Sequence, residues 1–357
     1  MKIITVVGAR PQLVKEAILQ EEIRKYSDIS HIFVHTGQHY DFEMSDVFIQ
    51  QMSLKQPDYF LGINRQTNIT SISLMMIELE KVYIKHTPDF VIVYGDTDST
   101  LAAALTAKKM NIKVVHIEAG LRQEPKSMPE EVNRVLTDHI STVLFTSSEV
   151  GTRNLNFEGI HKNIYNVGDI MYDVFLRYSP QFNNQVLSEF CLKDNNYLLF
   201  TLHRNFNVDV KHSLENILIV MNQVNRHLKV VFPIHPRTLK MIEKYGLNDL
   251  IKNLVVIQPQ NYINLMSLVK FSNKVVTDSG GLQKEAYFSE KNALVLMEDT
   301  GWRELIDKDY NRLIDVNTNF FDEVLGFSNP IVDKNIYGEG SVQIKVLKIL
   351  RELEGLK

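Results

Sequence analysis

The 357-residue chain has a single cysteine, Cys191, and therefore cannot form an internal disulfide. It also lacks any cluster of cysteine and histidine residues with the spacing of metal ligands. Disulfides are rare in reducing compartments, where thiols stay reduced. These two absences predict a cytoplasmic protein that holds no metal ion.

Long apolar runs and an excess of one charge are missing too. No run approaches the roughly 20 residues needed to cross a bilayer, and the apolar start from Met1 to Val7 is too short for the core of a signal peptide. The formal net charge is -4 and the sequence pI is about 6.3. No overall basic field would attract nucleic acid or an acidic membrane, so we expect a soluble protein that binds neither.

The chain does contain a repeated alternation of short apolar runs and helix-like segments. Runs such as Ile3 to Val7 and Phe90 to Tyr94 suit strands buried on both faces of a parallel sheet. The alternation stops at about residue 170 and restarts after a polar, turn-rich segment, and 44% hydrophobic residues suffice for two cores. We predict an α/β fold of two doubly wound, Rossmann-like domains, 1–170 and 171–341, with a helix at 342–353 that can pack back on the first.

Charged side chains follow several predicted strands of the first half. Arg10 lies in the turn after the first strand, and Lys15 lies one turn into the next helix. Asp96 and Glu118 come directly after two later strands. Ligands of open α/β sheets bind beyond the carboxyl ends of the strands, so these acids should converge on one crevice and suggest acid–base work there. The alternative for the two cations is that they are solvated surface charges.

Other polar residues of this half have local explanations. Asp98 or Ser99 is explained as the N-cap of a helix at 101–110. Glu130 lies in the first turn of a later helix, where an acid suits the helix dipole and can pair with Arg134 four residues on.

The second half contains a strand, a Ser-Gly-Gly turn and the start of a helix. The turn reads Asp278-Ser279-Gly280-Gly281. Backbone N–H groups in the first turn of a helix lack intrahelical partners, and paired glycines let a phosphate approach them closely. The alternative is that Ser279 only caps the helix and the glycines only form a turn. His203 and His235, each followed closely by an arginine, come after two other strands.

A dinucleotide cofactor is not expected. The chain has no G-x-G-x-x-G fingerprint with an acidic partner. Acids in one domain and a phosphate cradle in the other instead imply chemistry at a group attached to a diphosphate, in the cleft between the domains.

Six motifs occur in order between residues 8 and 285. They are Gly8-Ala9-Arg10-Pro11-Gln12 with Lys15, Gly95-Asp96-Thr97, His116-Ile117-Glu118-Ala119-Gly120-Leu121-Arg122, Pro129-Glu130-Glu131-Val132-Asn133-Arg134, His203-Arg204, and Asp278-Ser279-Gly280-Gly281-Leu282-Gln283-Lys284-Glu285. Together they resemble the non-hydrolysing UDP-N-acetylglucosamine 2-epimerases. The resemblance implies a GT-B architecture, with two domains facing across a cleft, and interconversion of UDP-GlcNAc and UDP-ManNAc. It also implies a cytoplasmic homodimer that supplies precursors for cell-surface polysaccharide.

The resemblance further implies a mechanism and its residues. The C2 proton is removed and UDP is expelled to give a 2-acetamidoglucal, after which the proton returns to the other face and UDP is re-added. By resemblance, the catalytic candidates are Asp96, Glu118, Glu130 and His203. The candidates for binding UDP are Arg10, Lys15, Arg134, His235, Ser279, Gly280, Gly281 and Glu285, with Glu285 expected on the ribose. A regulatory UDP-GlcNAc site of some members is loosely matched by Gln38, His39, Arg65 and Gln66.

Departures from the family pattern leave the sugar open. Asn205-Phe206-Asn207 replaces the usual Arg-Glu-Asn or Ala-Glu-Asn, and Thr300-Gly301-Trp302-Arg303-Glu304 replaces a common Thr-Glu-Arg-Pro-Glu. Met128-Pro129-Glu130-Glu131 and Trp302 are more similar to the branch that acts on modified sugars, including UDP-2,3-diacetamido-glucuronate. The remaining alternatives are a GT-B glycosyltransferase, a hydrolysing epimerase that releases free ManNAc, and a non-catalytic sensor of UDP-sugars.

Overall fold

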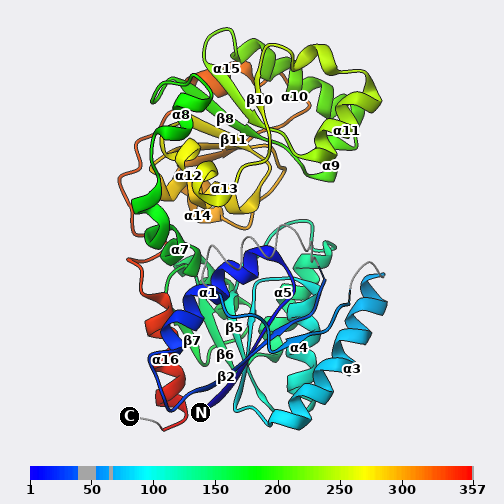
Figure 1. Ribbon diagram of the computed structural model, residues 1–357, viewed down its shortest axis with the longest axis vertical. Coiled ribbons are helices and arrows are strands. Elements are labelled where there is room, and N and C mark those ends of the chain that lie inside the picture. Colours follow the sequence, from blue (N-terminus) through cyan, green and yellow to red (C-terminus); the bar gives the residue numbers. More distant parts are fainter. Residues whose placement is uncertain (39–53, 64–66, 356–357) are drawn as a thin grey trace. The chain divides into compact units, whose positions relative to one another are not determined.

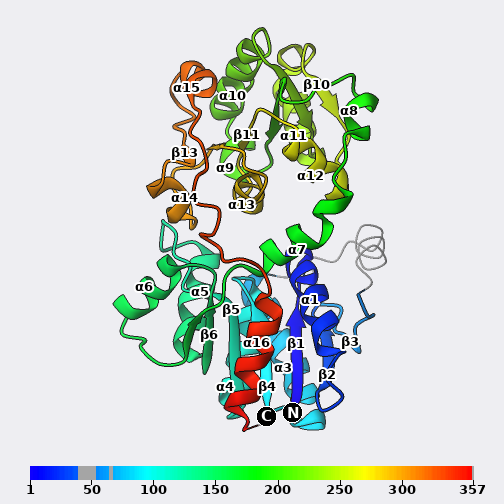
Figure 2. The same ribbon diagram turned by 90° about the vertical axis from the view of Figure 1, so that its left-hand side faces the viewer.

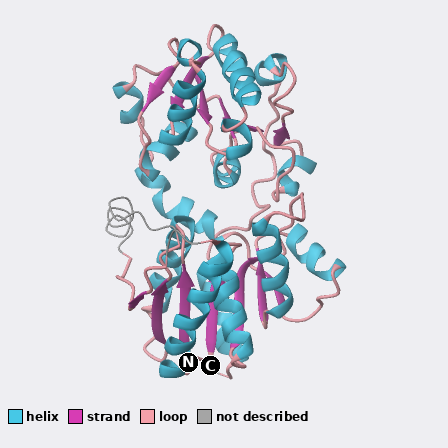
Figure 3. Cartoon of the chain, turned by 90° about the vertical axis from the view of Figure 1, so that its right-hand side faces the viewer, coloured by secondary structure: helices cyan, strands magenta, loops and turns pink. Residues whose placement is uncertain are grey.

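The computed structural model describes residues 1–38, 54–63 and 67–355. The chain divides into two compact units. Unit 1 comprises Met1–Val174 and Asn335–Lys357, and unit 2 comprises Phe175–Lys334. Each unit has its own parallel sheet flanked by helices (Figure 3). The predicted α/β class with two Rossmann-like, doubly wound parts is confirmed. None of the described helices is long and apolar enough to cross a membrane.

The described part of unit 1 contains a seven-stranded parallel sheet with the order β3-β2-β1-β4-β5-β6-β7. Its strands are β1 (Lys2–Val7), β2 (Ser30–His35), β3 (Tyr59–Phe60), β4 (Phe90–Tyr94), β5 (Lys113–Ala119), β6 (Val143–Thr146) and β7 (Ile164–Asn166). The strand order reverses at β1, which lies between β2 and β4. Such a switch point is where open α/β sheets bind their ligands.

Helices cover both faces of this sheet (Figures 1 and 2). On one face α3 (Asn68–His86), α4 (Asp98–Lys109) and α5 (Pro129–Ile140) pack in succession, and on the other α1 (Arg10–Ile23) packs against α16 (Val342–Leu353). The unit also contains α6 (Glu149–Phe157) and the start of α7 (Ile170–Tyr178). The β-branched residues of β1 and β4 and the alanines of α4 form one buried core.

Asp173 of α7 ties the C-terminal helix to unit 1. Its carboxylate accepts hydrogen bonds from the backbone N–H groups of Ser341 and Val342, the latter at 2.7 Å. These groups lie at the start of α16, where backbone donors lack intrahelical partners. Burial raises the pKa of Asp173 to about 6. The helix predicted at 342–353 therefore has those bounds and is anchored beside α1.

The described part of unit 2 contains a six-stranded parallel sheet with the order β10-β9-β8-β11-β12-β13. Its strands are β8 (Tyr197–Thr201), β9 (Lys229–Pro233), β10 (Val255–Ile257), β11 (Lys274–Thr277), β12 (Ala293–Val295) and β13 (Asn311–Leu313). The order reverses at β8, between β9 and β11. This sheet therefore has a switch point of its own.

Short helices flank the second sheet. They are α8 (Gln185–Glu189), α9 (Asn205–Val208), α10 (Lys211–Val224), α11 (Pro236–Tyr245), α12 (Tyr262–Lys270), α13 (Gly280–Phe288), α14 (Arg303–Asp307) and α15 (Phe321–Gly326), with 3-10 turns at Ser179–Gln181 and Asn248–Leu250. Helix α10 packs against α9 and α15, whereas α12 packs against α8 and α13. The main core lies between the sheet and α10.

Candidate active site

Gln12 joins two loops at the switch point of unit 1. Its side-chain oxygen accepts hydrogen bonds from the backbone N–H groups of Gly8 (2.8 Å) and Ala9 (3.1 Å), and its amide nitrogen donates to the carbonyl of Tyr94 at 2.7 Å. A Cβ at Gly8 would lie 1.9 Å from the Ser99 hydroxyl oxygen, so only glycine fits there. The start of α1 and the end of β4 are thereby held against each other.

Glu118 lies at an irregular position at the end of β5. Its φ is 74°, and the register with β6 shifts between Ile117 and Ala119. A positive φ is uncommon for a residue other than glycine, and a bulge re-aims the side chain at which it occurs. The Glu118 carboxylate forms an ion pair with Lys15 of α1, and the two side chains are only 11% and 7% exposed. Lys15 is therefore not a solvated surface charge.

Asp96 follows β4 and forms an ion pair with Arg134 of α5. Arg134 also pairs with Glu131 at 2.9 Å. Burial lowers the pKa of the Arg134 guanidinium, but the charges of Asp96 and Glu131 outweigh it and leave that pKa above its ordinary value. The predicted pairing of Arg134 with Glu130 is wrong, because Arg134 pairs with the next residue of the first turn of α5, Glu131. Glu130 itself is half-buried in that turn.

Helix α5 also carries Asn133 and Asp138, both buried. The Asn133 amide donates to the backbone carbonyl of Asp96 and to the carboxylate of Asp98, both at 3.0 Å. Asp98 is thus a partner of α5 and not a helix cap. The N-cap of α4 is Thr97, whose hydroxyl oxygen accepts from the Thr100 N–H, so the predicted cap at Asp98 or Ser99 is wrong.

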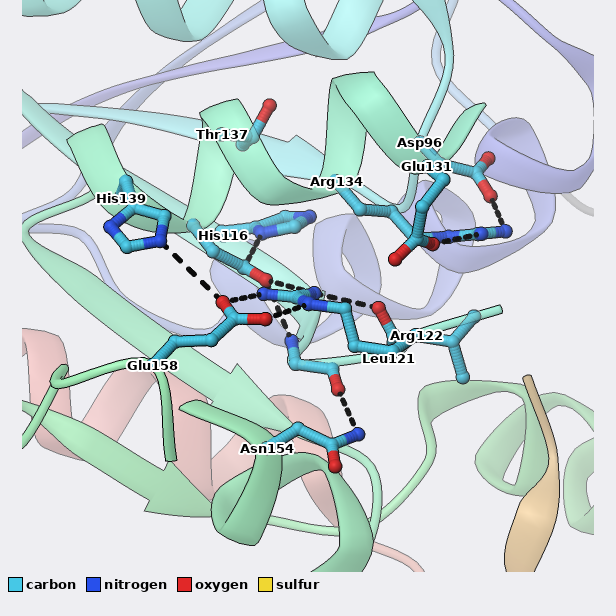
Figure 4. A network of polar contacts seen from close by, with 12 residues as sticks. Asp96, His116, Leu121, Arg122, Glu131, Arg134, Thr137, His139, Asn154 and Glu158 are labelled. Atoms are coloured by element: carbon cyan, nitrogen blue, oxygen red, sulfur yellow. Dashed lines mark hydrogen bonds and ion pairs between the residues drawn. The ribbon is translucent and has the colours of Figure 1, made fainter. Parts of the chain in front are cut away.

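A buried polar network lies under α5 (Figure 4). His116 of β5 contacts Asp138 through Nδ1 at 2.7 Å and the Gly95 carbonyl through Nε2 at 2.8 Å. Asp138 also accepts from the Gly120 N–H (3.0 Å) and from Arg122 (2.7 Å). Burial alone would raise the pKa of Asp138, but His116 and Arg122 hold it below its ordinary value.

The proposed regulatory residues lie mostly outside the described part of the chain. Of the four, Gln38 is described, and His39, Arg65 and Gln66 are not. The Gln38 side-chain oxygen accepts hydrogen bonds from the backbone N–H and the hydroxyl of Ser99, at 3.0 and 2.7 Å. Gln38 is therefore held at the start of α4.

In unit 2, Asp278 joins the ends of β8 and β11 at the switch point. Its carboxylate, with a side chain that is 0% exposed, accepts from the backbone N–H groups of His203 (3.0 Å) and Arg204 (2.8 Å). His203 Nδ1 lies 3.0 Å from the same carboxylate, and its ring is 37% exposed. Burial opposes ionisation of Asp278, but these partners hold its pKa below the ordinary value.

The Ser-Gly-Gly turn begins α13. Ser279 is the N-cap, and its hydroxyl accepts from the Leu282 N–H at a long 3.5 Å. The Gly280 carbonyl accepts from the Trp302 indole N–H at 2.8 Å. A Cβ at Gly280 would approach no other atom closer than 3.9 Å, and one at Gly281 would meet nothing within 4 Å. Neither packing nor a positive φ explains these glycines.

Two further candidates lie near this turn. His235 is the exposed N-cap of α11, where Nδ1 accepts from the Arg237 N–H at 3.1 Å, and its ring centroid lies 6.0 Å from that of His203. Burial, His203 and Arg237 lower its pKa. Glu285, in the second turn of α13, is 9% exposed. Burial of Tyr262 raises the pKa of this tyrosine well above the ordinary value, and the nearby charge of Glu285 raises it further.

The structure thus assembles the predicted residues into two groups, each within its own unit. In unit 1, Lys15 pairs with Glu118 and Arg134 pairs with Asp96, whereas Arg10 is exposed as the first residue of α1. His203, His235 and the α13 turn are grouped around Asp278 in unit 2. Among the described residues, no three His, Cys, Asp or Glu side chains are placed to hold a metal ion.

Sequence reasoning gave no role to several residues that build this site. They are Gln12, His116, Asn133, Asp138 and Asn207, the last of which bonds Asp278 at 3.2 Å and the Leu296 carbonyl at 2.9 Å. One signal was available for α5, because Glu130, Arg134 and Asp138 recur every four residues and so share a helix face. That spacing identifies a common polar face, but not its partners.

Comparisons with known proteins show which family the chain resembles. A family described as UDP-N-acetylglucosamine 2-epimerase matches residues 21–351. The chain is 43% identical to a UDP-N-acetylglucosamine 2-epimerase homolog of Methanococcus maripaludis, over 99% of this chain and 100% of that protein. It is 38% identical to the UDP-2,3-diacetamido-2,3-dideoxy-D-glucuronate 2-epimerase of Pseudomonas aeruginosa, with the same coverage.

Solved structures give the same result for the fold. The UDP-GlcNAc 2-epimerase of Methanocaldococcus jannaschii, in complex with UDP-GlcNAc and UDP, superposes with a TM-score of 0.88 at 35% identity, over 99% of this chain and 100% of that one. A sucrose-phosphate synthase of Thermosynechococcus elongatus, at 10% identity, has a TM-score of 0.62 and shares the fold alone. The predicted GT-B type of architecture is confirmed.

Proposed function

The chain belongs to the UDP-N-acetylglucosamine 2-epimerase family, a family of isomerases, and on that premise we propose that it inverts C2 of a UDP-activated N-acetylhexosamine. The proposed reaction converts UDP-GlcNAc to UDP-ManNAc without hydrolysis. The observation that carries the proposal is the pair of strand-end carboxylates, Asp96 and Glu118, each joined to a buried cation beside the switch point of unit 1. Acids held in this way are suited to moving a proton at a fixed place.

The proposed reaction is an elimination followed by an addition. A carboxylate takes the C2 proton, the C2–H electrons form the C1=C2 double bond of a 2-acetamidoglucal, and the C1–O bond breaks with its electrons leaving on UDP. For return, C2 takes a proton on its other face and a UDP oxygen re-forms the bond to C1. Asp96, Glu118 and Glu130 of unit 1 are proposed for the proton transfers, with Arg10, Lys15 and Arg134 as cations near the reacting groups.

Unit 2 is proposed to hold UDP. The first turn of α13, in which Gly281 is exposed, offers backbone N–H groups, and the glycines at 280 and 281 leave space for a phosphate beside them. His203 and His235 lie next to one another at the same edge and can donate to a departing diphosphate. Glu285, one turn further along α13, is proposed to accept from the ribose hydroxyls.

A second substrate is favoured by one observation. The relative from Pseudomonas aeruginosa acts, by its name, on UDP-2,3-diacetamido-2,3-dideoxy-D-glucuronate, and it matches this chain over 99% of its length. The same elimination can act on that sugar, because it too bears a nitrogen substituent at C2 and UDP at C1. The proposal therefore has two substrate candidates and one reaction.

One assay tests the reaction and the substrate together. The protein is incubated with each UDP-sugar in deuterated water, without metal or acceptor, and C2 is followed by NMR and mass spectrometry. We expect deuterium at C2 and formation of the 2-epimer with UDP still attached. Free ManNAc would indicate a hydrolysing enzyme, transfer only after an acceptor is added would indicate a glycosyltransferase, and no exchange with either sugar would refute the proposal.

Two variants test the assigned residues. In Glu118→Gln and His203→Ala the C2 exchange rate should fall by about a hundredfold to ten-thousandfold, the usual contribution of a general acid or base, while UDP still binds in calorimetry. Glu352→Gln, on the exposed part of α16, is the matched control and should exchange at the wild-type rate. Wild-type rates in both site variants would contradict these roles.

The remaining implications of the resemblance stay predictions. These are the homodimer, the cytoplasmic location and the supply of polysaccharide precursors. Three exposed isoleucines, Ile69, Ile77 and Ile84, lie on the outer face of α3, where a second copy of the chain would cover apolar surface.

A further inference from the structure

His116 holds two loops of unit 1 at once. Its Nε2 lies 2.8 Å from the carbonyl of Gly95, the residue before Asp96. Its Nδ1 lies 2.7 Å from Asp138, whose other oxygen accepts from the N–H of Gly120, two residues after Glu118. The imidazole ring and Asp138 therefore connect the backbones that carry both strand-end acids, and both side chains are completely buried.

The partners fix the protonation of the His116 ring. A carbonyl oxygen can only accept, so Nε2 must carry a proton. Asp138 also accepts from Gly120 N–H and from Arg122, which is the pattern of an ionised carboxylate. Nδ1 must then carry a proton as well, and His116 is an imidazolium. Arg122 in turn pairs with Glu158 through two hydrogen bonds of 2.7 and 2.6 Å, so the charges alternate in sign along this network.

The loops that His116 holds have unusual backbones. Gly95, Glu118 and Gly120 have φ values of 60°, 74° and 78°. A Cβ at Gly120 would lie 2.3 Å from the carbonyl oxygen of Gly151, so this turn is pressed against α6. Residues held in sparsely populated conformations persist only when the surrounding contacts determine them. The hydrogen bond from His116 to the Gly95 carbonyl and the one from the Gly120 N–H to Asp138 are such contacts.

We propose that His116, as a buried imidazolium paired with Asp138, is a positioning residue that sets the separation and aim of Asp96 and Glu118 for the proton transfers. The inference rests on the proposed epimerase reaction for its kinetic part. It assigns His116 no contact with substrate, because both ring nitrogens are already bonded within the protein. A displacement of about 1 Å at reacting groups can lower a rate about a hundredfold.

The first test is a spectroscopic measurement on the wild-type protein. In a long-range 1H–15N NMR experiment at neutral pH, both ring nitrogens of His116 should give the signals of protonated nitrogens. His161, on the surface of the same unit, serves as the reference histidine. One unprotonated nitrogen in His116 would overturn the proposal, whether or not the protein is an epimerase.

The second test uses two variants that each keep one arm of the ring. His116→Asn places an amide near Nδ1 and loses the bond to Gly95, whereas His116→Gln places an amide near Nε2 and loses the bond to Asp138. Deuterium uptake should rise chiefly at residues 95–97 in the first and at 118–121 in the second. In both, kcat for C2 exchange should fall on the order of a hundredfold, while KM and UDP affinity stay unchanged.

The outcomes separate this inference from the proposed function. His161→Gln is the matched control and should change neither uptake nor kcat. Unchanged kcat in folded His116 variants, or an equal loss of kcat and UDP affinity, would overturn the positioning role. An inactive wild-type protein would refute the proposed function instead, and the NMR and deuterium measurements would still decide whether His116 braces the two loops. If both variants fail to fold, the NMR measurement on the wild type decides alone.

Discussion

The same side-chain pair, a histidine Nδ1 on a buried aspartate, occurs at the switch points of both units. His116 pairs with Asp138 in unit 1, and His203 pairs with Asp278 in unit 2. In each case the aspartate also accepts from backbone N–H groups of a strand-end loop. The two histidines differ in exposure, at 0% and 37%. The pair in unit 1 is therefore fully enclosed, whereas the pair in unit 2 leaves the His203 ring accessible, as its proposed contact with UDP requires.

The surroundings of the two pairs also differ in how far their polar groups are already bonded. The acids Asp96 and Glu118 of unit 1 are already joined to Arg134 and Lys15. The corresponding edge of unit 2 offers backbone donors and unfilled space at Gly281. In the proposed function, the fixed charges of unit 1 serve proton transfer, and the open edge of unit 2 receives an anion. Three substitutions test this contrast.

The largest effect is expected for Asp278→Asn. The amide of asparagine keeps one accepting oxygen instead of two, so it cannot serve all the donors that now share the carboxylate, which are the N–H groups of His203 and Arg204, the Asn207 amide and the His203 ring. Each buried group left unpaired costs about 1–3 kcal/mol. We expect the unfolding free energy of unit 2 to fall by about 3 kcal/mol, measured by urea denaturation followed through Trp302, the single tryptophan. Asp249→Asn, on the surface of the same unit, is the control. An unchanged midpoint in Asp278→Asn would show that the pair is not a brace.

This effect should depend on pH with a definite sign. The pKa of Asp278 is held below its ordinary 3.8, so the folded protein favours the ionised carboxylate more than the unfolded chain does. The stabilisation is fully present above the unfolded pKa and is lost as pH falls through the lower folded pKa. The difference between wild type and Asp278→Asn should therefore shrink only below about pH 4.

A smaller effect is expected for Gln12→Ala in unit 1. The substitution leaves the Gly8 and Ala9 donors without their partner, at about 1–3 kcal/mol for a lost buried hydrogen-bonding group. It also removes one of the two hydrogen bonds to the Tyr94 carbonyl, which still accepts from the Thr100 hydroxyl. Hydrogen exchange of residues 8–10 and 94–97 should accelerate accordingly, because it reports local opening. Gln56→Ala, at an exposed position of the same unit, should leave both segments unchanged. If these residues exchange as slowly in Gln12→Ala as in the wild type, the ion pairs of Lys15 and Arg134 alone hold the site of unit 1 in place.

Much of the sheet architecture could be predicted, because buried parallel strands read as continuous apolar runs. The strand at Phe90–Tyr94 has the predicted bounds. The two-residue β3 and the polar β13, Asn311–Leu313, lack that signal and were missed. Helix α12 was also not predicted; it starts at Tyr262, and the Asn261 side chain caps it by accepting from the Asn264 N–H.

The candidate site was predictable to the extent that strand ends share an edge. That rule brings Asp96 and Glu118 together from sequence alone. It cannot identify Asp138, because the role of this residue depends on His116, 22 positions away. Nor can it identify the positive φ of Glu118, which arises from the bulge against β6. Contacts between distant segments, and the backbone geometry they impose, are fixed only in the folded unit.

The smallest effect on stability, and the sharpest test of unit 2, is expected for Gly281→Ala. The added methyl would meet no protein atom within 4 Å, and alanine is favoured over glycine in a helix by roughly 0.5–1 kcal/mol. The unfolding free energy should therefore rise slightly. UDP affinity, measured by calorimetry, should nevertheless fall, because the methyl would occupy the space proposed for a phosphate. Gly326→Ala in α15 is equally unobstructed and serves as the control, with the same small gain and no change in UDP affinity. If Gly281→Ala binds UDP as tightly as the wild type does, the first turn of α13 is only a helix start and does not bind an anion. The proposed contrast, in which unit 1 carries fixed charges and unit 2 binds an anion, would then fail in unit 2.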